Sequence, residues 1–118
     1  MRDLPNVLFV HYDDLKADLE TEMRRIATFC EIDVEESAWP ALVATVGLDA
    51  MRTEARGVDN PMSMVWEGGA DRFFFKGTNG RWRDVLTDDD LALYDTAAAT
   101  LEPALREWLE HGRHAIKM

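Results

Sequence analysis

A cluster of basic residues surrounds two glycines in a chain that is otherwise acidic. Its members are Arg72, Lys76, Gly77, Gly80, Arg81 and Arg83. Glycine lets a backbone approach a ligand closely and present its N–H groups, and Lys and Arg side chains bind phosphate oxygens. The cluster therefore predicts a phosphate-binding loop. A tight turn that carries solvated charges is the alternative, and these residues alone leave it open.

The charge of the whole chain limits what such a loop can bind. The 118 residues carry a net charge of -10, and the isoelectric point is near 4.6. A surface of this sign repels nucleic acid and anionic lipid, so we exclude DNA, RNA and membrane surfaces as partners. A small polyanionic ligand needs a local basic pocket, which the residues around Gly77 could form.

Composition indicates an ordinary soluble protein, with 47% hydrophobic and 31% charged residues. No apolar run is long enough to cross a bilayer, and the first residues lack the layout of a signal peptide. Cys30 is the only cysteine, which excludes an internal disulfide and fits a reducing compartment. We therefore expect a cytoplasmic location. His111 and His114 have no cysteine or acidic partner that would complete a metal site, so we expect no metal.

Residues 6–12 form a short, nearly continuous apolar run that is rich in β-branched and aromatic side chains. This pattern predicts one buried strand of a parallel sheet. The rest of the chain holds no second strand of similar strength. We therefore expect the neighbouring strands to lie outside this sequence, and another chain covering this strand is one possible source.

Helices account for most of the remaining pattern. Apolar residues recur at helical spacing over residues 13–30, and this stripe includes Cys30, for which we expect a thiol buried in the core. Residues 35–46 and 48–55 predict two further helices, whereas the Gly, Asn and Pro content of residues 57–71 predicts a loop.

The last third of the chain carries clear helix boundaries. Thr87 is a good N-cap for a helix that starts at Asp88, Pro103 suits a first turn and Gly112 a C-cap. Trp82 is expected to pin the Gly77 loop on the core. Together these elements predict that residues 1–118 are an α/β fragment, the C-terminal part of a domain, mostly helical, with one parallel-type strand and a Gly-rich phosphate loop.

The segment from Phe74 to Thr87 resembles the C-terminal signature of the cytosolic-type sulfotransferases. These enzymes use 3′-phosphoadenosine-5′-phosphosulfate (PAPS), and the signature is approximately Arg-Lys-Gly-x-x-Gly-x-Trp-Lys/Arg. In that family the loop holds the 3′-phosphate of PAPS. The resemblance implies this role for Lys76 and Gly77, with Phe74 and Phe75 preceding them and Arg81 as supporting charge. Phe75 stands where the family has arginine.

Two further segments resemble the same family, in the same order. Residues 10–16 resemble its Tyr-Glu-Asp-Leu/Met-Lys motif, which implies that Tyr12 lies near the adenine. Residues 46–52 resemble its Thr-Ser-Phe-x-x-Met-Lys motif, which lines the adenine pocket and implies that role for Val46 and Met51. Arg52 replaces the family's lysine, and Val46 and Leu48 lack the hydroxyl and the aromatic ring of the family pattern.

The resemblance implies the C-terminal part of a P-loop-like sulfotransferase fold and transfer of a sulfuryl group from PAPS to a hydroxyl or amine. The family's N-terminal Lys-Ser/Thr-Gly-Thr phosphate loop and its histidine base have no counterpart in this sequence. We therefore assign no catalytic residue, expect the isolated chain to be inactive, and expect a structural role for His11. The alternative is a non-catalytic truncated fragment or a helical interaction module.

Overall fold

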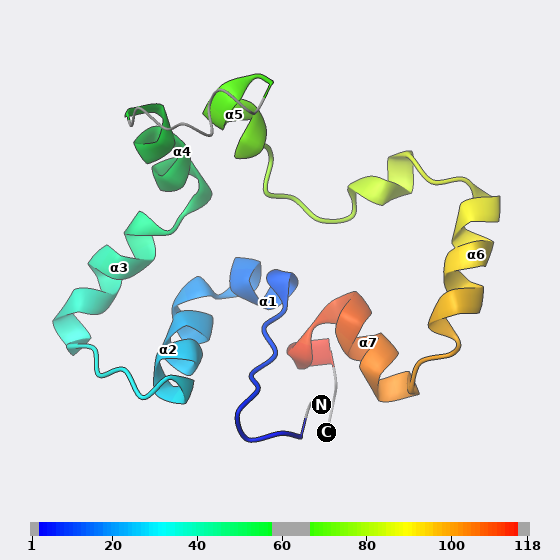
Figure 1. The fold of residues 1–118 in the computed structure, drawn as a ribbon, viewed down its shortest axis with the longest axis horizontal. Helices are drawn as coiled ribbons and strands as arrows, with labels where there is room; N and C mark the ends of the chain where they lie inside the picture. Colours follow the sequence, from blue (N-terminus) through cyan, green and yellow to red (C-terminus); the bar gives the residue numbers. More distant parts are fainter. Residues whose placement is uncertain (1–2, 58–66, 116–118) are drawn as a thin grey trace. The chain divides into compact units, whose positions relative to one another are not determined.

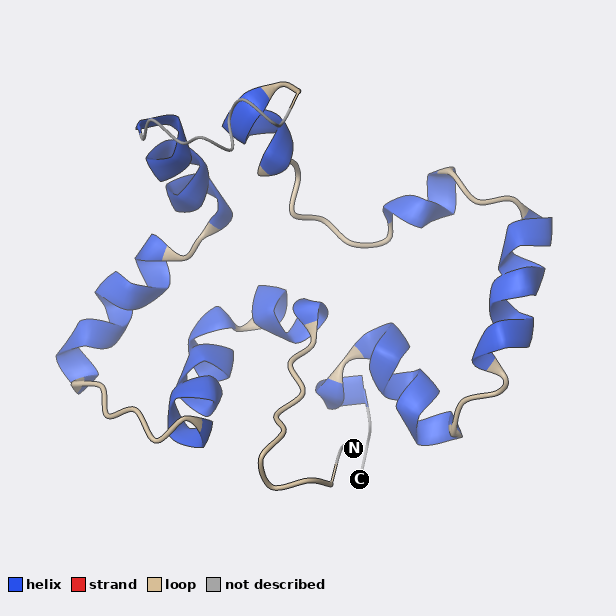
Figure 2. Ribbon diagram, viewed as in Figure 1, coloured by secondary structure: helices blue, strands red, loops and turns tan. Residues whose placement is uncertain are grey.

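The structure is a computed structural model that describes residues 3–57 and 67–115. These residues form helices joined by loops, and no strand occurs among them (Figures 1 and 2). None of the described helices has both the length and the apolar character needed to cross a membrane. The chain divides into two compact units. One comprises Met1–Ile32 and Asn79–Met118, and the other comprises Asp33–Thr78.

The segment expected to be a strand, residues 6–12, contains no strand. It has no regular secondary structure over residues 7–11, and helix α1 (Tyr12–Ala17) begins at its end. The prediction is wrong for the described chain, because strand N–H and C=O groups must pair with a neighbouring strand and none is described. Side chains hold the segment instead. Arg25 Nη2 donates to the carbonyl of Phe9 at 2.6 Å, and the Phe9 ring meets Trp108 edge-on at 5.5 Å.

The helix expected over residues 13–30 is two helices, α1 and α2 (Leu19–Phe29). The break lies at Asp18, whose carboxylate accepts hydrogen bonds from the backbone N–H of Thr21 at 3.1 Å and from its hydroxyl at 2.7 Å. An aspartate that caps the start of a helix has non-helical backbone angles, so it cannot also continue the preceding helix. Cys30 is the C-cap of α2 and is exposed, so the prediction of a core thiol is wrong.

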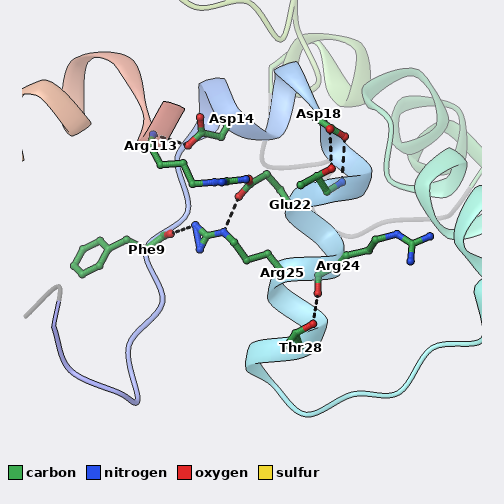
Figure 3. Close-up of polar contacts among 9 residues, drawn as sticks. Phe9, Asp14, Asp18, Glu22, Arg24, Arg25, Thr28 and Arg113 are labelled. Carbon is green, nitrogen blue, oxygen red and sulfur yellow. Dashed lines mark hydrogen bonds and ion pairs between the residues drawn. The ribbon is translucent and has the colours of Figure 1, made fainter. Parts of the chain in front are cut away.

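A buried carboxylate ties α2 to the C-terminal end of the chain (Figure 3). The Glu22 side chain is only 1% exposed. It accepts a hydrogen bond from Arg113 Nε at 2.8 Å and one from Arg25 Nε at 3.3 Å. A buried carboxylate needs such partners, because burial without them costs far more than the group can recover by packing. An ionic cluster of the buried Glu22 with Arg25 and Arg113 therefore joins α2 to the residues that follow α7.

A second buried carboxylate, Asp14, fixes the end of helix α7 (Pro103–His111). Its Oδ2 accepts from the backbone N–H of Arg113 at 3.0 Å. Gly112 is the C-cap of α7, as predicted, with φ of 82°. A Cβ at this position would lie 2.6 Å from Asp14 Oδ1, so the close approach itself requires glycine.

The remaining boundaries of this unit follow local chemistry. Helix α6 (Asp88–Ala98) starts at Thr87 with a full capping box, in which Thr87 and Asp90 each bond the other's backbone N–H. Pro103 lies in the first turn of α7. Both predictions are confirmed. Short 3₁₀ turns, η3 (Arg81–Asp84) and η4 (Arg113–Ala115), flank these helices.

The second unit contains η1 (Glu36–Ala38), α3 (Trp39–Thr45), α4 (Leu48–Gly57) and α5 (Gly69–Phe73). The helices predicted over residues 35–46 and 48–55 are confirmed, and Trp39 is buried at 6% exposure. Helix α5 lies where we expected a loop, and Arg56 of α4 forms an ion pair with its Asp71 at 2.5 Å. Residues 58–66 of that expected loop lie outside the described residues.

Candidate functional site

The Lys76–Gly77 turn follows α5 in a stretch without regular secondary structure. Gly77 has φ of 58° and Gly80 has φ of 78°, in the left-handed region that glycine enters without steric cost. Lys76 is exposed, and its Nζ lies 5.2 Å from the centre of the Phe75 ring. The backbone conformation at Gly77 and Gly80 therefore favours glycine, and Gly77 directly follows a solvent-accessible cation.

Arg52 of α4 binds the backbone directly before this turn. Its Nε and Nη2 donate to the carbonyl of Phe74 at 2.8 and 2.6 Å, and Nη2 also donates to the carbonyl of Phe75 at 2.5 Å. Its Nη1 donates to Asp49 Oδ1 at 2.8 Å. The sequence drew attention to Arg52 only as the replacement for a family lysine. Nothing local to position 52 indicates a partner more than 20 residues away.

The other predicted residues of this unit are Val46, Met51, Phe74 and Phe75. Val46 is the C-cap of α3 and is 40% exposed, whereas Met51 is half-buried in α4. Phe74 is half-buried and meets Phe73 edge-on at 4.9 Å, and Phe75 is 50% exposed. Helix α4 therefore carries Met51 beside Arg52, which holds the carbonyls of the two phenylalanines that precede Lys76.

Tyr12 and Arg81 belong to the other unit. Tyr12 is the first residue of α1 and is 47% exposed, and Arg81 is the exposed first residue of η3. The side-chain amide of Asn79 donates to the carboxylate of Asp13, next to Tyr12. This contact brings the later part of the glycine-containing segment to the start of α1. The sequence did not indicate it, because Asn79 is an ordinary turn residue by type.

Trp82 does not pin the loop on a core, contrary to our expectation. Its side chain is 46% exposed, and the Arg83 guanidinium stacks over its ring at 4.8 Å. The short η3 turn leaves the indole on the surface of its unit, where a cation covers one face of it. The pair presents a flat, positively charged surface.

His11 has a structural role, as expected. Its Nδ1 accepts from the backbone N–H of Asp13 at 3.1 Å, which makes His11 the N-cap of α1. Because Nδ1 accepts, the neutral ring carries its proton on Nε2, which lies 2.8 Å from the carbonyl of Leu109. The ring also meets Trp108 edge-on at 5.2 Å. Nδ1 therefore caps α1, and Nε2 ties the start of α1 to α7.

The clear pKa shifts arise from hydrogen bonds at helix N-caps and from side-chain hydrogen bonds within and between helices. Hydrogen bonds from Thr21 hold the pKa of Asp18 below its ordinary value. A hydrogen bond from Arg106 lowers the pKa of Glu110, and the hydrogen bond to Glu110 raises the pKa of Tyr94. Residues 3–57 and 67–115 contain no group of three or more metal-ligating side chains.

Comparison with known proteins agrees with the motifs. The family model described as "Sulfotransferase domain" matches residues 1–108. A glycolipid sulfotransferase of Mycobacterium bovis is 33% identical over 114 residues, which are 95% of this chain and 35% of the relative. Cytosolic sulfotransferase 12 of Arabidopsis thaliana is 35% identical over 89 residues, covering 74% of this chain and 27% of the relative.

An amine sulfotransferase of Oryctolagus cuniculus is 27% identical over 95 residues, or 76% of this chain and 31% of the relative. The chain thus spans about a third of the length of the curated relatives that it matches. No solved structure matches it significantly.

Proposed function

The chain belongs to the sulfotransferase family, and we propose that it contributes the 3′-phosphate and adenine part of a nucleotide site in an enzyme that uses PAPS. The reaction is transfer of a sulfuryl group from PAPS to a hydroxyl or amine acceptor. Support comes from the family match over residues 1–108 and from relatives that are all named as sulfotransferases. A mostly helical chain is compatible with part of a P-loop-like fold.

The observation that carries the proposal is the turn at Lys76 and Gly77. An anion is bound by N–H groups and cations, and carbonyl oxygens repel it. The carbonyls of Phe74 and Phe75 point to the guanidinium of Arg52, while Gly77 takes a positive φ and has no Cβ to keep a ligand away from the backbone. In the proposal, the backbone N–H groups at this turn and the Lys76 ammonium hold the 3′-phosphate.

The other residues have supporting roles in the proposal. Val46 and Met51 line the adenine pocket, Tyr12 contacts the adenine, and Arg81 contributes positive charge. Sulfuryl transfer depends on positioning and on neutralising charge at the transferred group, as phosphoryl transfer does. The ligands of the protein are then a nucleotide and a small-molecule acceptor, in the cytoplasm, and the proposed protein partner is a further chain that covers residues 6–12.

The test is titration calorimetry of the full chain with adenosine 3′,5′-bisphosphate and with adenosine 5′-monophosphate, which lacks the 3′-phosphate. Hydrogen bonds to charged groups contribute about 1.5–3 kcal/mol each, so Lys76→Ala should weaken bisphosphate binding by about 10- to 100-fold. Binding of the monophosphate should be unchanged. Arg24→Ala, which removes an exposed charge from α2, is the matched control and should leave both affinities as they are.

Two results would contradict the proposal. One is equal affinity of the wild-type chain for the two nucleotides, and the other is an equal effect of Lys76→Ala on both. Absence of any nucleotide binding would favour the alternative, a helical interaction module or a non-catalytic fragment.

A further inference from the structure

Arg52 holds the backbone in front of the Lys76–Gly77 turn, and we infer that it is a positioning residue for the 3′-phosphate. The inference rests on the proposed function. Arg52 bonds two successive carbonyls, those of Phe74 and Phe75, with three hydrogen bonds of 2.5–2.8 Å. The site needs N–H groups to face the anion, and these bonds turn the preceding carbonyls to a cation instead.

The guanidinium is itself fixed on its other edge. Nη1 donates to Asp49 Oδ1 at 2.8 Å, one turn earlier in α4. The Arg52 side chain is 21% exposed, whereas that of Asp49 is 95% exposed. The planar fork is therefore held between the helix and the loop, and less rotamer entropy is lost on ordering it than for a flexible ammonium. Arg52 also places a permanent positive charge at the carbonyl of Phe75, two residues before Gly77 in the sequence.

Lysine could not reproduce this arrangement. Its ammonium is a compact point donor on a flexible stem, and it cannot present two edges of a plane to Asp49 and to two carbonyls. Arg52→Lys should therefore keep the charge and part of the carbonyl contact, and restore part of the function that Arg52→Ala loses.

A purely structural role for Arg52, as a general tie between α4 and the segment after it, makes a different prediction. Helix α4 has a second tie of that kind, the ion pair of Arg56 with Asp71 of α5 at 2.5 Å. That pair is more than half exposed on both sides, and it joins α4 to α5 rather than to the backbone of residues 74 and 75. Arg56→Ala is thus a charge-matched control from the same helix.

The experiment has two arms, both on the full chain. In the first, ¹⁵N relaxation measures the order of the backbone N–H groups of residues 75–78. Rigid backbone has an order parameter of about 0.85 and flexible backbone one below about 0.6. Arg52→Ala should move these N–H groups from the rigid to the flexible range, Arg52→Lys should give intermediate values, and Arg56→Ala should leave them unchanged.

The second arm measures binding of the two nucleotides used above. Arg52→Ala should weaken adenosine 3′,5′-bisphosphate by about tenfold, as the loss of one hydrogen bond to a charged group would, and Arg52→Lys by less. Adenosine 5′-monophosphate should bind all variants equally.

Unchanged order in Arg52→Ala overturns the inference, and so does lost order with unchanged bisphosphate affinity. Equal wild-type affinity for the two nucleotides overturns the proposed function instead. The relaxation measurement then still decides whether Arg52 orders the backbone at the turn.

Discussion

Replacing Glu22 by glutamine should destabilise the chain far more than the same replacement at an exposed glutamate. Glu22→Gln keeps the shape of the side chain and one oxygen acceptor, but it removes the negative charge that faces two guanidinium groups. The Glu22 side chain is 1% exposed, so water cannot replace the ionic hydrogen bonds that the substitution weakens (Figure 3).

The magnitude follows from the contacts of Glu22 with two arginines, of which Arg113 donates from both Nε and Nη2 to Oε1. Arg113 Nε donates to Oε1 at 2.8 Å, a short charge-assisted bond, and Arg25 Nε donates to Oε2 at a weaker 3.3 Å. Removing one partner of a buried ion pair costs about 3–5 kcal/mol. Arg113 and Arg25 are 32% and 27% exposed and regain some hydration, which reduces the cost. We expect a loss of about 2–4 kcal/mol in the free energy of unfolding, a large share of the about 5–15 kcal/mol typical of a domain.

The assay is urea unfolding followed by far-ultraviolet circular dichroism, with the midpoint shift converted through the slope of the wild-type transition. The control is Glu20→Gln on the same helix. Glu20 pairs with Arg24 at 2.8 Å, but the two side chains are 45% and 37% exposed, and such pairs contribute about 0–1 kcal/mol. Equal shifts for Glu22→Gln and Glu20→Gln would show that the buried carboxylate does not organise this unit.

Three further predictions concern α6, its N-cap and its contact with α7. Thr87→Ala removes its N-cap and should cost about 0.5–2 kcal/mol by the same urea assay. Because the Thr87 hydrogen bonds lower the pKa of Asp90, their stabilisation is present above the ordinary pKa of about 3.9 and is lost as pH falls through the lowered value. An NMR titration of Asp90 should show its pKa rise in Thr87→Ala. Glu110→Gln should lower the raised pKa of Tyr94, measured by tyrosinate absorbance, and an unchanged titration would contradict the contact at 2.9 Å.

The sequence by itself determined the helices whose first and last residues are set by capping residues nearby in the chain. Thr87 caps α6 with an oxygen three residues from the N–H that it accepts, and Pro103 and Gly112 bound α7 through their own backbone preferences. The family motifs are likewise contiguous in the chain, which is why Lys76 and Gly77 could be assigned a role before any coordinates. Each of these signals depends on residues within a few positions of one another.

Only the tertiary structure decided the features whose partners are distant. The segment over residues 6–12 has the composition of a strand, but a strand exists only where a neighbour pairs with it, and none is described. Glu22 meets Arg113 across 91 positions of sequence, and Arg52 meets the carbonyl of Phe74 across 22. A side chain's type limits which bonds it can form, but which partner it meets depends on how the chain returns in space, and that is not encoded at any single position.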